Sequence, residues 1–321
     1  MPGRRKHARA FSRAAEALPS AARFARPSQN ARLLRLLPAI ALVLAGVALL
    51  LYPHASSWLN QMEQDEVARI QQEAVSKAPE EDLSAEMAAA RDYNARLAEG
   101  RVIVSDPFDP DAPRTTGDEY GALLNLADDG VMAQLVIPCI EVNLPVYHGV
   151  EGEGMAHGTG HMPSTSLPVG GPSTHSVIAG HTGLPSAKIF DRLEELSEGD
   201  LFVIRVLGED HAYRVSSTET VLPDETESLA ITEGEDLVTL VTCTPYGANT
   251  HRLLVHAERT ELPEGWGEEE LALGGEVAKT LLDLRAPALA GLAVGLAAIL
   301  VWALVTRHCI AKREEGRHGR P

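Results

Sequence analysis

The stretch LVTCTPYGANTHRLLV, residues 240–255, combines residue types that cysteine-based nucleophilic catalysis needs. An apolar run leads into Cys243, a Pro-Tyr-Gly turn follows, and a second apolar run begins directly after Arg252. A catalytic thiol needs an imidazole to exchange its proton, and it needs donors to stabilise an oxyanion. If the two runs pair as neighbouring strands, a thiol and a guanidinium on the same face would meet. From spacing alone, an ordinary surface arginine remains the alternative for Arg252.

His181 is the candidate proton-transfer group among the twelve histidines. It lies in SVIAGHTGLPSAKIF, directly after an apolar strand-like run and between two glycines. Such a strand-to-loop position can present a general acid or base. His251 is a competing base beside Arg252, but alternation along a strand points neighbouring side chains to opposite faces.

His157 and His161 have the spacing of a metal-binding pair, with His148 nearby. A four-residue spacing brings two side chains together only on a helix, and Gly158 and Gly160 argue against a helix here. We therefore predict neither a metal site nor a cofactor.

The chain contains three cysteines, too few for a fold that depends on disulfides. Cys139 lies in the apolar run VIPCIEV, and Cys309 follows the last apolar segment of the chain. A bridge between Cys139 and Cys243 is formally possible but not expected. We predict that Cys139 is a buried thiol on a strand.

Two uncharged apolar segments, residues 36–52 and 286–306, are each about long enough to cross a bilayer. The first 35 residues contain nine Lys or Arg, the last 15 contain five, and the part between contains 14 basic and 42 acidic residues. Basic residues favour the cytoplasmic side, which predicts a two-span protein of the cell membrane with both termini cytoplasmic and the middle extracellular. A cleaved signal peptide is the alternative for the first segment. The acidic middle argues against a nucleic-acid partner.

Residues 130–260 contain short runs of Val, Ile, Leu and Thr separated by Gly, Pro and Asp turns. This pattern is typical of a closed, antiparallel-rich barrel or of a sandwich. One helical insertion is expected at Ser186–Leu196. Upstream, residues 58–100 are rich in Ala, Glu, Gln and Arg and are broken at Pro79, which predicts two amphipathic helices.

Composition divides the chain into eight parts. They are a basic N-terminus (1–35), a transmembrane or signal-anchor helix (36–52), juxtamembrane helices (53–100), a Pro- and Asp-rich loop (101–120), a β domain (121–260), an acidic linker (261–285), a transmembrane helix (286–306) and a basic tail (307–321).

Several of these motifs together resemble those of sortases, the membrane-anchored cysteine transpeptidases of Gram-positive bacteria. TLVTC (Thr239–Cys243) is similar to the TLxTC signature, and TCTPYGANTHRLLV, GHTGLPSA, LPVYHG and TSLPVGG look like blocks of the pilin-polymerising class, class C. This resemblance covers about residues 130–259. It continues in the double anchor, with YPHASSWLN after the first span, and in Asp106-Pro107-Phe108, which resembles the class C lid motif.

The resemblance implies a mainly β fold, an eight-stranded sortase-type barrel with N-terminal helices, a lid loop at 101–120 and two transmembrane helices. It implies that Cys243 is the nucleophile, that His181 is the general acid/base, and that Arg252 stabilises the oxyanion and positions the substrate. In the lid, Phe108 would cover the apolar groove over Cys243, and Asp106 would face the polar catalytic groups.

The implied reaction cleaves an LPxTG-like sorting signal between Thr and Gly and joins the acyl group to a lysine amine of another pilin. The implied partners are pilin subunits and the membrane. A wall-anchoring sortase of another class is the alternative. A tethered adhesin would need LPxTG just before its span, whereas the nearest sequence, Leu262–Gly265 (LPEG), lacks Thr-Gly and lies more than twenty residues upstream. A papain-type protease would carry its cysteine on a helix, whereas Cys243 ends a predicted strand.

Overall fold

The computed structural model describes residues 29–100, 104–109, 117–152 and 154–266, together with Gly291 and Gly295. Apart from these two glycines, the predicted second span (286–306) lies outside the described residues, as do residues 1–28 of the basic N-terminus, the basic tail and most of the acidic linker. The chain divides into two compact units, residues 1–46 with 295–321 and residues 47–294. The α1 helix, Gln29–Lys77, contributes to both units.

The predicted helix break at Pro79 is confirmed. The α1 helix ends at Lys77, and α2 (Glu80–Glu99) begins with Pro79 as its N-cap residue. Three acidic residues in the first turn of α2 interact favourably with the helix dipole. The predicted first span and first juxtamembrane helix form one continuous helix, α1. Within the described part of the chain, Ile40–Lys77 is the helix that is long and apolar enough to cross a membrane.

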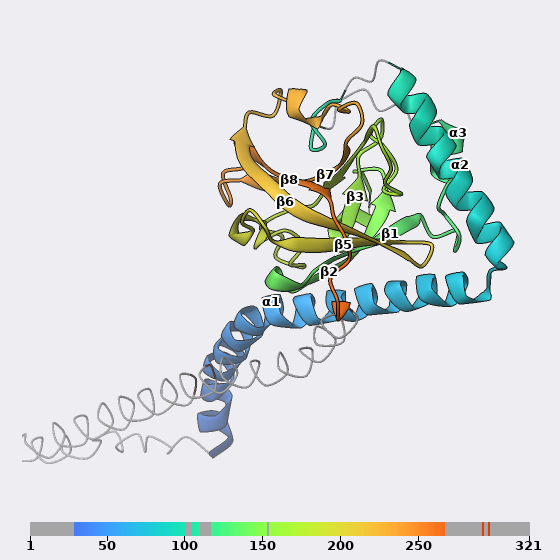
Figure 1. The fold of residues 1–321 in the computed structure, drawn as a ribbon. Coiled ribbons are helices and arrows are strands. Elements are labelled where there is room, and N and C mark those ends of the chain that lie inside the picture. Colours follow the sequence, from blue (N-terminus) through green and yellow to red (C-terminus); the bar gives the residue numbers. More distant parts are fainter. Residues whose placement is uncertain are drawn as a thin grey trace, which may run out of the picture. The chain divides into compact units, whose positions relative to one another are not determined.

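Eight strands form a closed barrel in the order β1-β2-β3-β4-β7-β8-β6-β5 (Figure 1), which confirms the predicted eight-stranded barrel. Two neighbouring pairs are parallel, β2 with β3 and β4 with β7, and the other pairs are antiparallel. The strands are β1 (Val131–Ile137), β2 (Val142–His148), β3 (Thr159–His161), β4 (Thr174–Ala179), β5 (Leu201–Val206), β6 (Glu209–Val221), β7 (Asp236–Thr244) and β8 (His251–Arg259).

Short helical elements lie between the strands. They are α3 (Asp118–Ala122), α4 (Gly154–His157) and the 3₁₀ turns η1 (Pro138–Ile140), η2 (Leu193–Glu195) and η3 (Glu227–Leu229).

The predicted helical insertion at Ser186–Leu196 is wrong, because only the η2 turn is helical there. The preceding residues form a loop in which one carboxylate satisfies two of the backbone N–H groups. The Asp191 carboxylate accepts from the N–H groups of Gly183 and Ile189, each at 3.2 Å. This arrangement lets Ile189 and Phe190 bury their side chains in the barrel core.

The sheet formed by β4, β7 and β8 separates two groups of buried apolar residues. Along β7, Val238 and Leu240 point into the large core of the barrel. Val241, the residue after Leu240, points to the opposite face of the sheet. There it belongs to a smaller cluster together with Leu254 of β8. Cys243 is two residues beyond Val241, so alternation places it on the same face as this smaller cluster.

Candidate active site

Cys243 and Arg252 are direct cross-strand partners at the end of the β7–β8 pair. The predicted pairing of the two apolar runs as neighbouring strands is therefore confirmed. Side chains of directly opposed residues lie on the same face of a sheet, so the half-buried thiol and the buried guanidinium are neighbours. His251 pairs with Thr244 and points to the other face, and its ring contacts the Thr250 hydroxyl at 2.9 Å.

His181 is brought level with Cys243 by the parallel pairing of β4 with β7. The last paired residues are Ala179 and Val241. Beyond them, the Gly180 N–H donates to the carbonyl of Val241 at 3.0 Å, and the Thr242 hydroxyl donates to the carbonyl of Gly180 at 2.7 Å. These two bonds join the end of β4 to the end of β7, where His181 and Cys243 follow.

Gly180 is required next to His181 because another residue packs against its backbone. A Cβ atom at this position would lie 2.6 Å from Cδ2 of Phe190. The Phe190 N–H in turn donates to the carbonyl of His181 at 3.0 Å. The loop 181–190 thus closes on itself with the Phe190 ring against Gly180, and this contact fixes the backbone that carries the imidazole.

Asp106, from the segment with the lid-like motif, forms an ion pair with Arg252. Its carboxylate accepts from Nε of Arg252 at 2.8 Å and from Nη2 at 2.6 Å. The two side chains are only 8% and 10% exposed, respectively. Asp106 Oδ1 also accepts from the backbone N–H of Phe108 at 3.2 Å, which orients the next turn of this segment.

Phe108 covers the thiol-bearing face of the sheet. Its ring centroid lies 5.4 Å from that of His181, and Cζ of Arg252 lies 5.2 Å from the Phe108 centroid. The ring also packs, with Val104, against the smaller apolar cluster. The segment 104–109 therefore contacts an imidazole, a guanidinium and the apolar surface beside Cys243.

Burial under this segment favours the neutral forms of the thiol and the imidazole. Burial raises the pKa of Cys243; the nearby Arg252 opposes this shift, and the Asp106 carboxylate adds to it. Burial also lowers the pKa of His181 below its ordinary value. In the covered state, at neutral pH, the pair consists of a thiol and a neutral imidazole.

The three histidines with metal-like spacing lie in different surroundings. His161 is fully buried, and its Nδ1 is 2.9 Å from the Tyr120 hydroxyl. His157 Nδ1 lies 2.6 Å from Oδ1 of Asn60 on α1, whereas His148 hydrogen bonds to two backbone carbonyls. Within residues 29–266, apart from the three gaps in the description, no three His, Cys, Asp or Glu side chains gather as a metal ion would require.

The prediction that Cys139 is a buried strand residue is wrong. The strand β1 ends at Ile137, and Pro138 starts the η1 turn, which exposes Cys139 between the buried Ile137 and Ile140. Cys139 and Cys243 are both free thiols, so the alternative of a bridge between them is also excluded. Cys309 lies outside the described residues.

A further polar group on the same sheet face is not predicted from the sequence. His256 of β8 pairs with Thr239 of β7, four residues along each strand from the Arg252–Cys243 pair. Both side chains join a hydrogen-bonded chain that runs from His175 to Glu219. The one sequence signal for this group is strand alternation, which places Thr239 and His256 on the same face as Cys243 and Arg252.

The fold and this site define the class of protein to which the chain belongs. A sortase-domain profile matches residues 135–260. Sortase A of Streptococcus agalactiae serotype III is 30% identical over 131 residues, which cover 40% of this chain and 52% of that relative. The matched region thus spans about half the length of that relative.

Two solved structures are similar over nearly their whole lengths. Sortase C1 of GBS pilus island 1 is 37% identical with a TM-score of 0.57, covering 63% of this chain and 94% of that one. Sortase C-1 of Actinomyces oris is 48% identical with a TM-score of 0.51, covering 56% of this chain and 99% of that one. The chain belongs to the sortase family of cysteine transpeptidases. The resemblance to class C drawn from the sequence is confirmed by these two structures.

Proposed function

We propose that this chain is a pilin-polymerising transpeptidase with Cys243 as nucleophile, His181 as general acid/base and Arg252 as oxyanion and substrate-positioning group. The observation that carries the proposal is the Cys243–Arg252 cross-strand pair, with His181 level with it on the neighbouring strand end. A thiol, an imidazole and a guanidinium at adjoining strand ends provide the three groups that acyl transfer through a thioester needs.

The first half of the proposed reaction forms a thioester. His181 takes the proton of Cys243, and the thiolate attacks the carbonyl carbon between Thr and Gly of an LPxTG-like signal. A C–S bond forms while Arg252 donates to the developing oxyanion. The intermediate collapses, the C–N bond breaks, and His181 returns the proton to the leaving glycine amine.

The second half transfers the acyl group to an amine. The Nζ atom of a pilin lysine attacks the thioester carbonyl, and an isopeptide C–N bond forms as the C–S bond breaks. One proton of the attacking amine passes to His181. His181 then gives a proton to the departing Cys243 thiolate, which restores the starting thiol. Transfer in preference to hydrolysis requires that water be kept from the thioester.

The segment with Asp106 and Phe108 is proposed to be a lid that regulates access to the thiol. Its carboxylate occupies the Nε and Nη2 donors of Arg252, and its aromatic ring lies against His181. Substrate and lid therefore compete for the same groups, and the lid must leave before an acyl-enzyme can form. The Pro107 between them restricts the backbone of this turn.

The test of the reaction uses the full chain in detergent micelles with a peptide that carries an LPxTG signal. Intact-mass spectrometry should detect an acyl adduct that is absent in Cys243→Ala and unchanged in Cys139→Ala. The matched cysteine variant separates the proposed nucleophile from the exposed thiol. An adduct that persists in Cys243→Ala would refute the assignment of the nucleophile.

The acceptor distinguishes this proposal from a wall-anchoring sortase of another class. The relative from Streptococcus agalactiae serotype III is called Sortase A, and this name gives the wall-anchoring alternative some support. With a preformed thioester, a folded pilin domain bearing an acceptor lysine should compete against a short glycine-amine peptide. Preferential ligation to the lysine ε-amine supports the pilin acceptor, and exclusive use of the glycine amine supports the wall-anchoring alternative.

We also propose that the protein spans the cell membrane twice, with both termini cytoplasmic and the barrel outside. The exposed apolar side chains of α1, including Leu42 and Leu49 at 76% and 75% exposure, support its insertion into lipid. The native cysteines can test this topology in a Cys243→Ala background. A membrane-impermeant maleimide applied to intact cells should label the exposed Cys139 and leave Cys309 unlabelled until the cells are lysed. The mass of the isolated chain tests the alternative of a cleaved first segment.

A further inference from the structure

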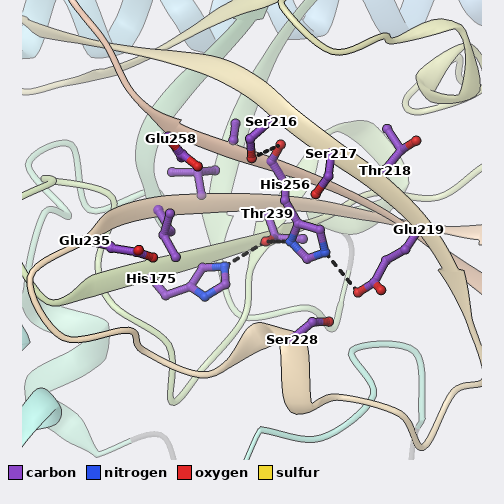
Figure 2. A pocket seen from close by; sticks show the side chains of 13 residues that line it. His175, Ser216, Ser217, Thr218, Glu219, Ser228, Glu235, Thr239, His256 and Glu258 are labelled. Atoms are coloured by element: carbon purple, nitrogen blue, oxygen red, sulfur yellow. Dashed lines mark hydrogen bonds and ion pairs between the residues drawn. The ribbon is translucent and has the colours of Figure 1, made fainter.

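Four side chains from four neighbouring strands form one hydrogen-bonded chain (Figure 2). Alternation from Cys243 and Arg252 places this chain on the thiol-bearing face. His175 Nε2 lies 2.7 Å from the Thr239 hydroxyl, which lies 2.8 Å from His256 Nδ1. His256 Nε2 lies 3.0 Å from Oε1 of Glu219. At the other end, His175 Nδ1 lies 2.9 Å from the carbonyl oxygen of Ala230.

The direction of every bond in this chain follows from its fixed end. A carbonyl oxygen only accepts, so His175 Nδ1 carries a proton and donates to Ala230. Burial lowers the pKa of His175 to about 4, so at neutral pH its Nε2 has no proton and accepts from the Thr239 hydroxyl. Thr239 has then used its one proton and must accept from Nδ1 of His256. The remaining atoms, His256 Nε2 and the Glu219 carboxylate, are both acceptors unless one further proton lies between them.

Four hydrogen bonds therefore need four protons, and three neutral donors supply only three. The Ser228 hydroxyl, then the neighbouring His256, lower the pKa of Glu219 against the opposing effect of burial, so Glu219 is ionised at neutral pH. The other charged groups that line this pocket are the carboxylates of Glu235 and Glu258, with no Lys or Arg among its described lining residues. A negative environment favours a cation, so the fourth proton belongs on Nε2 of His256.

One end of the chain is bonded to the segment that contains η3, and the other end lies beside it. Ala230 supplies the carbonyl at the His175 end, and Ser228 lines the same pocket as Glu219 and lowers its pKa. Between them, Leu229 is buried in the smaller apolar cluster with Val241, two residues from Cys243. The η3 segment therefore forms a wall of the apolar surface beside the thiol.

The same segment also contacts the lid. The Thr226 hydroxyl donates to the carbonyl oxygen of Val104 at 2.9 Å. Val104 and Phe108 both pack against the cluster that contains Leu229. Movement of η3 would consequently change both the apolar groove and the surface on which the lid rests.

We propose that His175, Thr239, His256 and Glu219 are positioning residues for the η3 wall of the substrate groove, and that one proton held on His256 completes their network. The effect on substrate rests on the proposed sortase function, whereas the location of the proton does not. When the proton is lost, one of the four bonds cannot be made, η3 loosens, and binding of the sorting signal weakens.

The proton can be located by NMR on the full chain in micelles, labelled with ¹⁵N-histidine. Variants His175→Gln and His256→Gln assign the two rings. At pH 7, both ring nitrogens of His256 should be protonated, whereas His175 should be neutral with its proton on Nδ1. A neutral His256 at pH 7 would overturn the proposal, because the chain would then lack its fourth proton.

Glu219→Gln provides a matched variant, because its amide group can donate to an unprotonated His256 Nε2. We expect His256 to become neutral with Nδ1–H retained, so that all four bonds persist without the extra proton. Glu219→Ala removes the partner altogether. Backbone amides of residues 227–230 should then exchange faster with solvent in Glu219→Ala than in Glu219→Gln, and equal rates would refute the link between the network and η3.

The effect on the groove is measured by the split between KM and kcat for an LPxTG peptide. At neutral pH, KM of Glu219→Ala should be roughly 2- to 10-fold higher than KM of Glu219→Gln, the effect of one lost hydrogen bond. The two kcat values should be equal. Equal KM values, with the NMR and exchange results as expected, would overturn the positioning role. A wild type that forms no acyl-enzyme would instead count against the sortase reaction and leave the proton assignment standing.

Discussion

Replacing Asp106 by Asn tests whether the lid controls access to Cys243. The change keeps the shape of the side chain and one acceptor oxygen but removes the charge and one of the two bonds to Arg252. Hydrogen bonds to charged groups contribute about 1.5–3 kcal/mol each after the competing bonds to water are considered. The Asp106 and Arg252 side chains are mostly buried, so solvent screens their interaction little.

The expected magnitude follows from the loss of about one such bond. If alkylation of Cys243 requires the lid to open, its rate is proportional to the fraction of open molecules. A loss of about 1.5–3 kcal/mol raises that fraction by roughly 10- to 150-fold. The rate of reaction with a small alkylating reagent, followed by intact mass in a Cys139→Ala background, should rise by the same factor.

A second effect of the substitution must be separated from lid opening. The Asp106 carboxylate contributes to the raised pKa of Cys243, so its removal also increases the thiolate fraction at neutral pH. The limiting rate at high pH, where the thiol is fully ionised, reports access alone. Phe108→Ala weakens the lid without removing the charge and should raise the limiting rate as well. If neither variant raises the limiting rate, the lid does not protect the thiol and the reasoning fails.

Three further predictions concern the scaffold of the site. His161 is fully buried, and burial lowers its pKa to about 4. Its contribution to stability is therefore complete above about pH 6.5 and is lost as pH falls towards 4. At pH 5 the free energy of unfolding should be about 2 kcal/mol lower because of His161, and urea denaturation of His161→Gln should show a correspondingly flatter pH dependence. Gly180→Ala should lower the free energy of unfolding by about 1–3 kcal/mol and slow thioester formation, because the added methyl group would displace the Phe190 ring; an unchanged melting temperature would contradict that packing. Asn94 is buried on α2 and makes two hydrogen bonds to the backbone of Leu167. Asn94→Ala should therefore lower the free energy of unfolding, measured with denaturant, by about 1–3 kcal/mol. An unchanged free energy of unfolding would mean that water replaces both bonds.

The barrel could be predicted because its strands carry local signals that agree with their tertiary positions. In β7, alternation of side chains between the two apolar faces combines with β-branched residues, and the turn before β8 contains Pro and Gly. The loop containing Ile189 and Phe190 carries an apolar pattern that suggests a helix. Asp191 accepts from two N–H groups within the loop, and the Phe190 ring packs against Gly180 at the end of β4. The second contact depends on the surrounding fold. The prediction for Cys139 fails because Pro138 begins a 3₁₀ turn, so that the strand ends at Ile137, two residues before Cys139.

The proposed catalytic constellation is partly predictable from the sequence because Cys243 and Arg252 lie on one hairpin, where turn length predicts the register. His181 comes from β4, and only the parallel β4–β7 pairing places it beside them. The sequence does not predict the network of Thr239 and His256, because its four members come from four strands. The function proposed for it depends on hydrogen-bond direction, which composition and spacing do not contain.

The donors of Arg252 explain why a closed lid and the proposed oxyanion role exclude each other. Nη1 donates to the carbonyls of Asn249 and His251 at 3.2 and 3.1 Å, and these bonds belong to the β7–β8 turn and strand themselves. Nε and Nη2 point to the carboxylate of Asp106. A guanidinium has five N–H groups, so only one is left when the lid is closed. Opening the lid leaves the Nη1 bonds in place to hold the plane of the guanidinium and frees Nε and Nη2 together. The carboxylate of the lid therefore occupies the two donors that the proposed oxyanion would need, and the same movement that exposes the thiol also makes its electrostatic partner available.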